Sequence, residues 1–147
     1  MNINKFTQSS LAAVQGCEKI AMEYGNQEIE QEHLLYALLT IDDSLILKLF
    51  EKMGITKESA VNRVEEAIRK RPKVQGGQMF IGKDLNNVLI YAEDEAKQMG
   101  DEYVSVEHLL LSMIRDVDCV ATRILITLSI NLQKIFQDIM TAAGADP

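Results

Sequence analysis

The chain contains an internal repeat: when it is shifted by 75 residues, its sequence matches itself without a gap. The tetrapeptide Glu-His-Leu-Leu occurs at residues 32–35 and again at 107–110. Identical residues also recur around this motif, in the pairs Glu18 and Glu93, Ala21 and Ala96, Gly25 and Gly100, and Ile55 and Ile130. Self-similarity at a fixed offset indicates two copies of one supersecondary unit. We therefore expect two units packed across a pseudo-twofold axis, with a groove where they meet.

The two units are residues 1–71 and 81–144, and residues 72–80 link them. The linker begins at Pro72 and contains Gly76 and Gly77, which are the strongest turn signals in the chain. A unit of about 70 residues buries too little surface to be robust alone. The 147 residues are therefore expected to form one domain.

Composition and helical spacing favour an all-α fold. Two prolines, no tryptophan and many leucine, alanine, glutamate and lysine residues favour helices over strands. Glycines 25 and 54 are expected to end helices, and Asp84 and Ser105 are good N-cap residues. Apolar residues three and four apart predict helices in the first unit from 7 or 9 to 24, from 30 or 31 through 39, at 44–53 and at 57–71. Four helices per unit predict eight helices in a pseudo-twofold tandem repeat.

Charge and cysteine content narrow the partners and the compartment. The formal net charge of −7 argues against nucleic acid as a partner and favours cationic or apolar protein segments. Cys17 and Cys119 are too few for a disulfide scaffold and are expected to be small core residues. No signal peptide pattern opens the chain, and no run of about 18 apolar residues would span a membrane. A reducing cytoplasm is the expected compartment.

Residues 77–84 match the phosphate-binding loop G-x-x-x-x-G-K up to its last position. That position should be Ser or Thr, whose hydroxyl group holds magnesium, but Asp84 would place a carboxylate against the phosphates. In phosphate-binding loops the motif directly follows a buried parallel strand, but residues 72–77 of this chain show no strand pattern. We expect a loop without bound phosphate that ends in Asp84 as an N-cap. Nucleotide binding by this segment is one alternative, which would make the chain an enzyme.

The two histidines of the chain, His33 and His108, both lie in the repeated motif. Neither H-E-x-x-H nor C-x-x-C spacing supports a metal site. Glu107 complements the dipole of the helix that follows Ser105, and His108 can hydrogen-bond back to the start of that helix. No aspartate-oriented histidine accompanies either cysteine. We therefore expect no catalytic residue, no metal ligand and no cofactor; a metal hydrolase acting through the histidines is the second enzyme alternative.

The repeated motif, with Phe6-Thr7 at the start and Ala-x-x-x-Gly ending the first helix of each unit, resembles the Clp N-terminal repeat domain. That module precedes the ATPase rings of ClpA, ClpB and ClpC, which are hexameric AAA+ unfoldases. The resemblance runs from Phe6 to Gly144, and residues 72–77 are most similar to the linker of the ClpB branch. It implies an eight-helix pseudo-dimer that makes the first contact with substrates or adaptors.

The resemblance also implies binding residues. In ClpB, the positions of Thr7, Asp101 and Glu107 support substrate handling. In ClpC, the positions of Glu32 and Glu107 recognise phosphorylated arginine. The second unit departs from the pattern, because Ile81-Gly82 stands where the first unit has Phe-Thr. A twofold-equivalent site would therefore lack the threonine hydroxyl group.

We thus expect a substrate- and adaptor-binding domain of a ClpB-type disaggregating chaperone. Its partners would be unfolded or aggregated protein segments and adaptor proteins, not nucleic acids or membranes. The isolated domain would be a monomer and the parent ATPase a hexamer. The alternative within the family is a ClpC- or ClpA-type unfoldase that feeds a protease. Because Glu32 and Glu107 would lie near helix N-termini, replacing either by glutamine is expected to cost only about 0.3 kcal/mol of stability.

Overall fold

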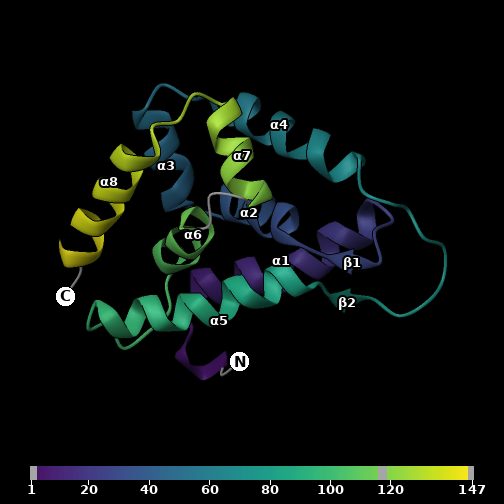
Figure 1. Ribbon diagram of the computed structural model, residues 1–147, viewed down its shortest axis with the longest axis horizontal. Helices are drawn as coiled ribbons and strands as arrows, with labels where there is room; N and C mark the ends of the chain where they lie inside the picture. Colours follow the sequence, from purple (N-terminus) through teal and green to yellow (C-terminus); the bar gives the residue numbers. More distant parts are fainter. Residues whose placement is uncertain (1–2, 116–118, 146–147) are drawn as a thin grey trace.

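The structure, a computed structural model, describes residues 3–115 and 119–145 and is built from helices (Figure 1). Eight α-helices lie within these ranges, preceded by a 3-10 turn at Ile3–Lys5. They are α1 (Gln8–Glu23), α2 (Gln31–Thr40), α3 (Leu45–Lys52), α4 (Lys57–Arg69), α5 (Lys83–Gln98), α6 (Val106–Ile114), α7 (Val120–Thr127) and α8 (Leu132–Ala145). The predicted all-α, eight-helix fold is confirmed. Only the fourth helix ends clearly earlier than expected, at Arg69 instead of Arg71.

Two very short strands accompany the helices. Strand β1 (Glu28–Ile29) pairs in parallel with β2 (Phe80–Ile81), so that Ile29 lies opposite Ile81. The expectation that residues 77–84 form a loop ending in Asp84 as an N-cap is therefore wrong for the second half of that segment. Gly82 is the N-cap of α5, and Asp84 lies in the first turn of the helix. Two residues are too few to show an alternating pattern, and the pairing partner is distant in the sequence.

The strand pairing follows the repeat. Shifting Ile29 and Ile81 by 75 residues in opposite directions gives Val104 and Phe6, and these two residues form an isolated parallel bridge. The backbone N–H of Gly82 donates to the carbonyl oxygen of Ile29 at 2.8 Å, and that of Thr7 donates to Val104 at 3.0 Å. The opening residues of each unit therefore pair with the other unit, directly before that unit's second helix.

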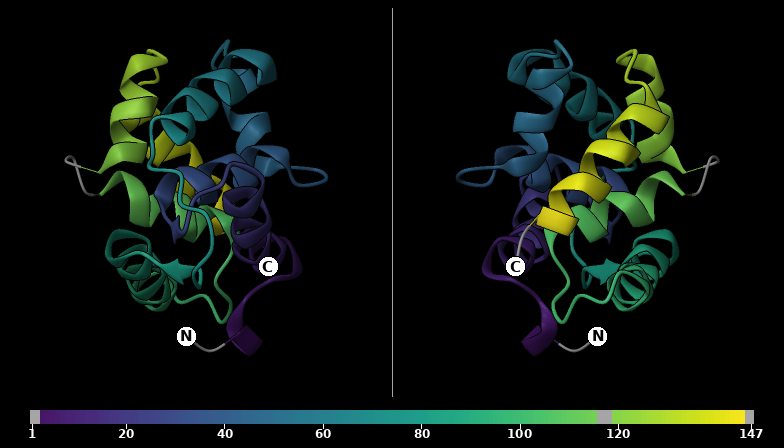
Figure 2. Two further views of the ribbon diagram at one scale, coloured as in Figure 1. Left: turned by 90° about the vertical axis from the view of Figure 1, so that its right-hand side faces the viewer. Right: turned by 90° about the vertical axis from the view of Figure 1, so that its left-hand side faces the viewer.

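Helices α2 and α6, which carry the repeated motif, form the centre of the molecule (Figures 1 and 2). Helix α1 packs on α2 and α5 on α6, and each of α1 and α5 also contacts the central helix of the other unit. The two central helices are buried nearly all round, and the largest share of their buried side chains are leucines (Leu34, Leu35, Leu38, Leu39, Leu109, Leu110, Leu111). In the part of the chain that the structure describes, no helix combines the length and hydropathy needed to cross a membrane.

Candidate functional site

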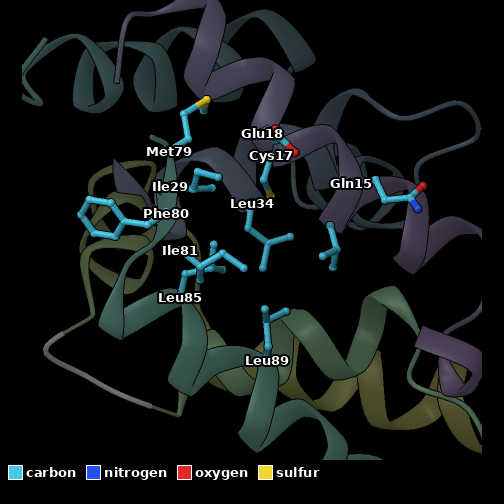
Figure 3. A pocket seen from close by; sticks show the side chains of 11 residues that line it. Gln15, Cys17, Glu18, Ile29, Leu34, Met79, Phe80, Ile81, Leu85 and Leu89 are labelled. Carbon is cyan, nitrogen blue, oxygen red and sulfur yellow. The ribbon is translucent and has the colours of Figure 1, made fainter. Parts of the chain in front are cut away.

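An apolar groove lies between α1 and α5, the first helices of the two units (Figure 3). It has a volume of about 220 Å³. Its walls come from α1, from β1 and the start of α2, and from β2 and α5; its lining residues are Val14, Gln15, Cys17, Glu18, Ile29, Leu34, Met79, Phe80, Ile81, Leu85 and Leu89. Most of these side chains are apolar, while Gln15 and Glu18 add polar groups from α1. The groove therefore offers an apolar ligand a concave surface with an acidic margin.

One edge of the groove carries exposed apolar residues. Phe80 and Ile81 of β2 are 50% and 47% exposed, whereas Leu34 at the base is fully buried. Met79, Phe80 and Ile81 are consecutive, so they present a continuous apolar strip beside the cavity. Apolar surface beside a concavity is typical of ligand-binding sites.

Cys17 lies in the wall of the groove, but its thiol group is not a reactive nucleophile. Burial raises the pKa of Cys17 to about 12, so the thiol stays protonated at neutral pH. Its Sγ–H donates to the carbonyl oxygen of Ala13 at 3.4 Å. Since the thiolate is the nucleophilic form of cysteine, Cys17 is a packing residue, as predicted.

The two histidines close the N-termini of the central helices. The Nδ1 atom of His33 accepts from the backbone N–H of Glu30 at 2.9 Å, and that of His108 accepts from Ser105 at 2.9 Å. This confirms the predicted hydrogen bond from His108 back to the start of its helix. Burial lowers the pKa of His33 to about 4, and the positive charge of Arg71 adds to the shift. The repeated histidine is therefore explained by helix capping.

Glu32 does not lie open to a partner. Its carboxylate accepts from Nη1 of Arg71 at 2.9 Å, and Nη2 of the same guanidinium donates to Glu28 at 3.1 Å. The Glu32 side chain is only 4% exposed and that of Arg71 is 20% exposed. A buried carboxylate of this kind depends on its cation, which the estimate of about 0.3 kcal/mol for a helix terminus leaves out.

The other three candidate residues gather around Val104. Thr7 is the N-cap of α1, and its Oγ1 accepts from the backbone N–H of Ser10 at 3.2 Å. Asp101 accepts from Nε2 of His108 at 2.8 Å and keeps 30% of its side chain exposed. Glu107 accepts a hydrogen bond from the hydroxyl group of Ser105. Within residues 3–115 and 119–145, no lysine or arginine forms an ion pair with Asp101 or Glu107.

The structure therefore divides the four predicted residues. Thr7 is brought beside the segment that carries Asp101 and Glu107 by the bridge between Phe6 and Val104. Glu32 occupies the repeat-equivalent place in the other half, where Arg71 already neutralises it. Among the described residues, no cluster of three histidine, cysteine or acidic side chains could hold a metal ion.

Comparison with known proteins decides the family. The model of the Clp repeat (R) N-terminal domain matches residues 5–128 of the chain. The chain belongs to the Clp repeat N-terminal domain family. The match covers all of both central helices and both strands.

Curated relatives and solved structures agree with this Clp assignment. The chain is 37% identical to the chaperone protein ClpB of Nitratidesulfovibrio vulgaris over 141 residues, which are 92% of this chain and 16% of that protein. The Hsp104 N-terminal domain from Candida albicans matches with a TM-score of 0.81 and 18% identity over 97% of this chain and 93% of that one. A ClpV N-domain in complex with a VipB peptide matches with a TM-score of 0.73 and 21% identity, over 95% of this chain and 89% of that one.

Several residues that line the groove or neutralise Glu32 were not predicted from the sequence. Met79 and Phe80 belong to the predicted linker, although both line the groove and Phe80 is half-exposed at its edge. Arg71 was assigned to the end of a helix and not recognised as the partner of Glu32. The signal that was available for Met79 to Ile81 is a run of three apolar residues beside two glycines, which is unusual for a solvent-exposed linker.

Proposed function

We propose that this domain binds apolar segments of unfolded or aggregated proteins, and adaptor proteins, in the groove between α1 and α5. The observation that carries the proposal is the pair of half-exposed residues Phe80 and Ile81, next to the partly buried Met79, beside a concave apolar wall. Covering this strip with an apolar side chain removes its surface from water, which favours binding. We place the domain in a ClpB-type AAA+ disaggregating chaperone of the cytoplasm, a hexamer whose ATPase lies elsewhere in the protein.

The ligand chemistry follows from the groove and its margin. An unfolded chain supplies apolar side chains for the base, and Glu18 and the net charge of −7 favour basic residues at the margin. Affinity should be weak, since an unfolded ligand loses conformational entropy on binding. The peptide complex of the ClpV N-domain, which has the same fold, supports a peptide as the ligand. The proposal includes no cofactor, metal ion, nucleic acid or membrane, and an isolated domain that is monomeric.

Asp101 and Glu107 are proposed as a second, polar contact with the partner. Their carboxylates are partly exposed and, among the described residues, without an ion-paired lysine or arginine, whereas Glu32 is neutralised by Arg71. In a ClpC- or ClpA-type parent, which is the alternative, Glu32 and Glu107 would contact a phosphorylated arginine, and Glu32 would first have to leave Arg71. Thr7 would act mainly by capping α1 beside them.

Calorimetric titration of the domain tests the proposed function. We expect casein, which is unfolded, to bind, and ATP with magnesium or zinc to produce no binding heat. Binding of ATP or zinc without binding of casein would favour the enzyme alternatives instead. An arginine-phosphorylated protein in a parallel titration separates the ClpC-type alternative, because a clear preference for it would favour that branch.

The groove itself is tested by Phe80→Ala, which should weaken casein binding about tenfold because aromatic anchors carry much of the energy of such sites. Its stability should change little, since Phe80 is 50% exposed. Ile126→Ala is the matched control: Ile126 is 55% exposed on α7 and does not line the groove. Equal casein affinity of the two variants would place the binding site elsewhere.

Asp101→Asn and Glu107→Gln test the polar contact. Each should weaken binding of an arginine-rich unfolded peptide about threefold, in the range of a partly exposed ion pair, with a smaller effect on an arginine-free peptide of equal hydrophobicity. The measurement is a pair of affinities for each variant, together with a urea unfolding curve. If both peptides lose affinity equally, the carboxylates act through the fold and not through contact with the partner.

A further inference from the structure

The first helices of the two units are capped in different ways. At the start of α1, Thr7 is the N-cap, and its own hydroxyl oxygen accepts from the backbone N–H of Ser10 at 3.2 Å. At the start of α5, the N-cap is Gly82, which has no side chain to offer. The N–H that corresponds to that of Ser10 belongs to Leu85, and it donates to Oε2 of Glu30 at 3.2 Å. A carboxylate from the first unit thus replaces the missing hydroxyl of the second.

Gly82 is not required by its backbone conformation. Its φ and ψ are −69° and 162°, and those of Thr7 are −67° and 163°, which any L-residue adopts. The reason for glycine is space, because a Cβ atom at position 82 would collide with Oε1 of Glu30. That Cβ would also lie 2.8 Å from Oε1 of Glu28, but Glu28 is a half-exposed side chain that can move aside.

Glu30 itself is held in place. It is 4% exposed, it is the N-cap of α2, and it forms a capping box there with His33. One side chain therefore connects the N-termini of α2 and α5. Both helices contribute walls of the groove, through Leu34 and Leu85, and β2 lies directly before Gly82.

We propose that Glu30 is a positioning residue of the groove: by capping α5 from the other unit, it holds Leu85 and β2 in the geometry that receives an apolar ligand. The ligand part of this inference rests on the proposed function, whereas the capping part concerns the domain alone. Gly82 and Glu30 together cap α5 and α2, as Thr7 and Ser105 cap α1 and α6 in the other half. Neither residue of the pair is useful without the other.

The charges around Glu30 make this contact sensitive to pH. Burial raises the pKa of Glu30 to about 7, and Asp84 of α5 and Glu28 of β1 add to the shift, while Arg71 opposes it. His33, the other titratable neighbour on α2, stays neutral in this range because burial lowers its pKa to about 4. A carboxyl group that binds its proton more tightly in the capping position than in solvent favours that position when protonated. The contact should therefore loosen as pH rises through 7.

The paired exchange tests the proposal. Glu30→Ser should raise the hydrogen-exchange rate of the Leu85 amide about fivefold, and it should weaken casein binding about threefold. Gly82→Thr alone should weaken casein binding to a similar extent, because the new Cβ atom displaces the Glu30 carboxylate that connects α2 and α5. The pair Glu30→Ser/Gly82→Thr recreates the arrangement of Ser105 and Thr7, so it should restore both the Leu85 amide and the affinity to within about twofold. A pair as defective as either single variant would overturn the proposal.

The pH profile provides a readout that a merely structural residue would not move. In the wild-type domain, exchange of the Leu85 amide, corrected for its intrinsic pH dependence, should speed up from pH 6 to 8, and casein affinity should fall. The paired variant lacks the Glu30 carboxyl group, so its Leu85 exchange should not speed up between pH 6 and 8. Its affinity for the same casein should fall only by the amount that titration of casein itself causes. Leu85 exchange unaffected by Glu30→Ser, or singles that bind casein like wild type, would refute the inference. Failure of the proposed function is distinguishable, because wild type would then give no binding heat while the Leu85 amide still responds.

Discussion

Replacing Arg71 by glutamine should lower the free energy of unfolding by about 3 kcal/mol, because it leaves a buried carboxylate without its cation. The guanidinium lies 2.9 Å from Glu32 and 3.1 Å from Glu28, and the Glu32 side chain is only 4% exposed. Water cannot easily replace the lost charge at such a position. Urea unfolding of wild type and variant at pH 7 measures the difference.

A matched control lies two residues earlier. Arg69 forms an exposed ion pair with Glu65 at 3.0 Å within α4, so Arg69→Gln should cost only about 0.5 kcal/mol. Removing both buried charges, in Arg71→Gln/Glu32→Gln, should recover much of the loss, since the carboxylate that remains unpaired, Glu28, is half-exposed to water. If Arg71→Gln proves as mild as Arg69→Gln, the carboxylate of Glu32 is solvated and open to partners after all.

Glu32 and Glu107 show that equivalent positions of the repeat can have different environments. The two residues are equivalent in sequence and both lie in the first turn of a central helix. Their environments differ because the partner is not repeated: the position equivalent to Arg71 is Asp146, which lies outside the described residues. A glutamate at a helix start suggests dipole stabilisation of a few tenths of a kcal/mol, but the structure adds a cation from 39 positions further along the chain.

The helices could be predicted because their signals are local. Apolar spacing, the glycine after α1 and the capping serine before α6 all lie within a few residues of the ends they determine. The strands could not be predicted, since β1 and β2 are two residues each and exist only through their pairing. The general position of the groove could be predicted, because it lies where the two units meet. Its exposed edge could not be predicted, because that edge is β2.

The sequence contains part of the evidence that Glu30 replaces a side-chain cap at Gly82. The alignment of the two units shows Ile81-Gly82 in place of Phe-Thr, and it also places Glu30 opposite Ser105. Each departure alone looks like a loss of a small polar residue. Their connection is spatial, because the Phe6–Val104 and Ile29–Ile81 pairings bring each unit's start beside the other unit's second helix. Pairs of departures in a repeat are therefore more informative than single ones.

Acidification should destabilise the domain through His33. Burial lowers the pKa of this residue to about 4 from a usual value of 6.5, with a contribution from Arg71. The folded state thus binds the proton less tightly than the unfolded chain, so the stability is present above pH 6.5 and is lost as pH falls towards 4. The shift corresponds to a loss on the order of 3 kcal/mol. Glu30, whose pKa is raised to about 7, changes stability in the opposite direction over much of this range.

The variant Asn26→Asp separates the effect of His33 on acid stability from the effect of Glu30. The Nε2 atom of His33 lies 2.9 Å from Oδ1 of Asn26, whereas its equivalent in His108 lies 2.8 Å from a carboxylate oxygen of Asp101. A carboxylate at position 26 would stabilise the protonated ring and raise the pKa of His33. At pH 7 the variant should lose about 3 kcal/mol, because position 26 is only 3% exposed and the new carboxylate is buried without a lysine or arginine partner, and because the amide also donates to the carbonyl oxygen of Pro72.

The decisive quantity is the further loss between pH 7 and pH 4.5, measured by urea unfolding. It should be about 2 kcal/mol smaller in Asn26→Asp than in wild type, while Glu30 affects both proteins alike. The same chemical change at the exposed Asn62 of α4 is the control, and it should leave the acid dependence unchanged. Parallel acid losses in wild type and Asn26→Asp would show that His33 is not the group that titrates.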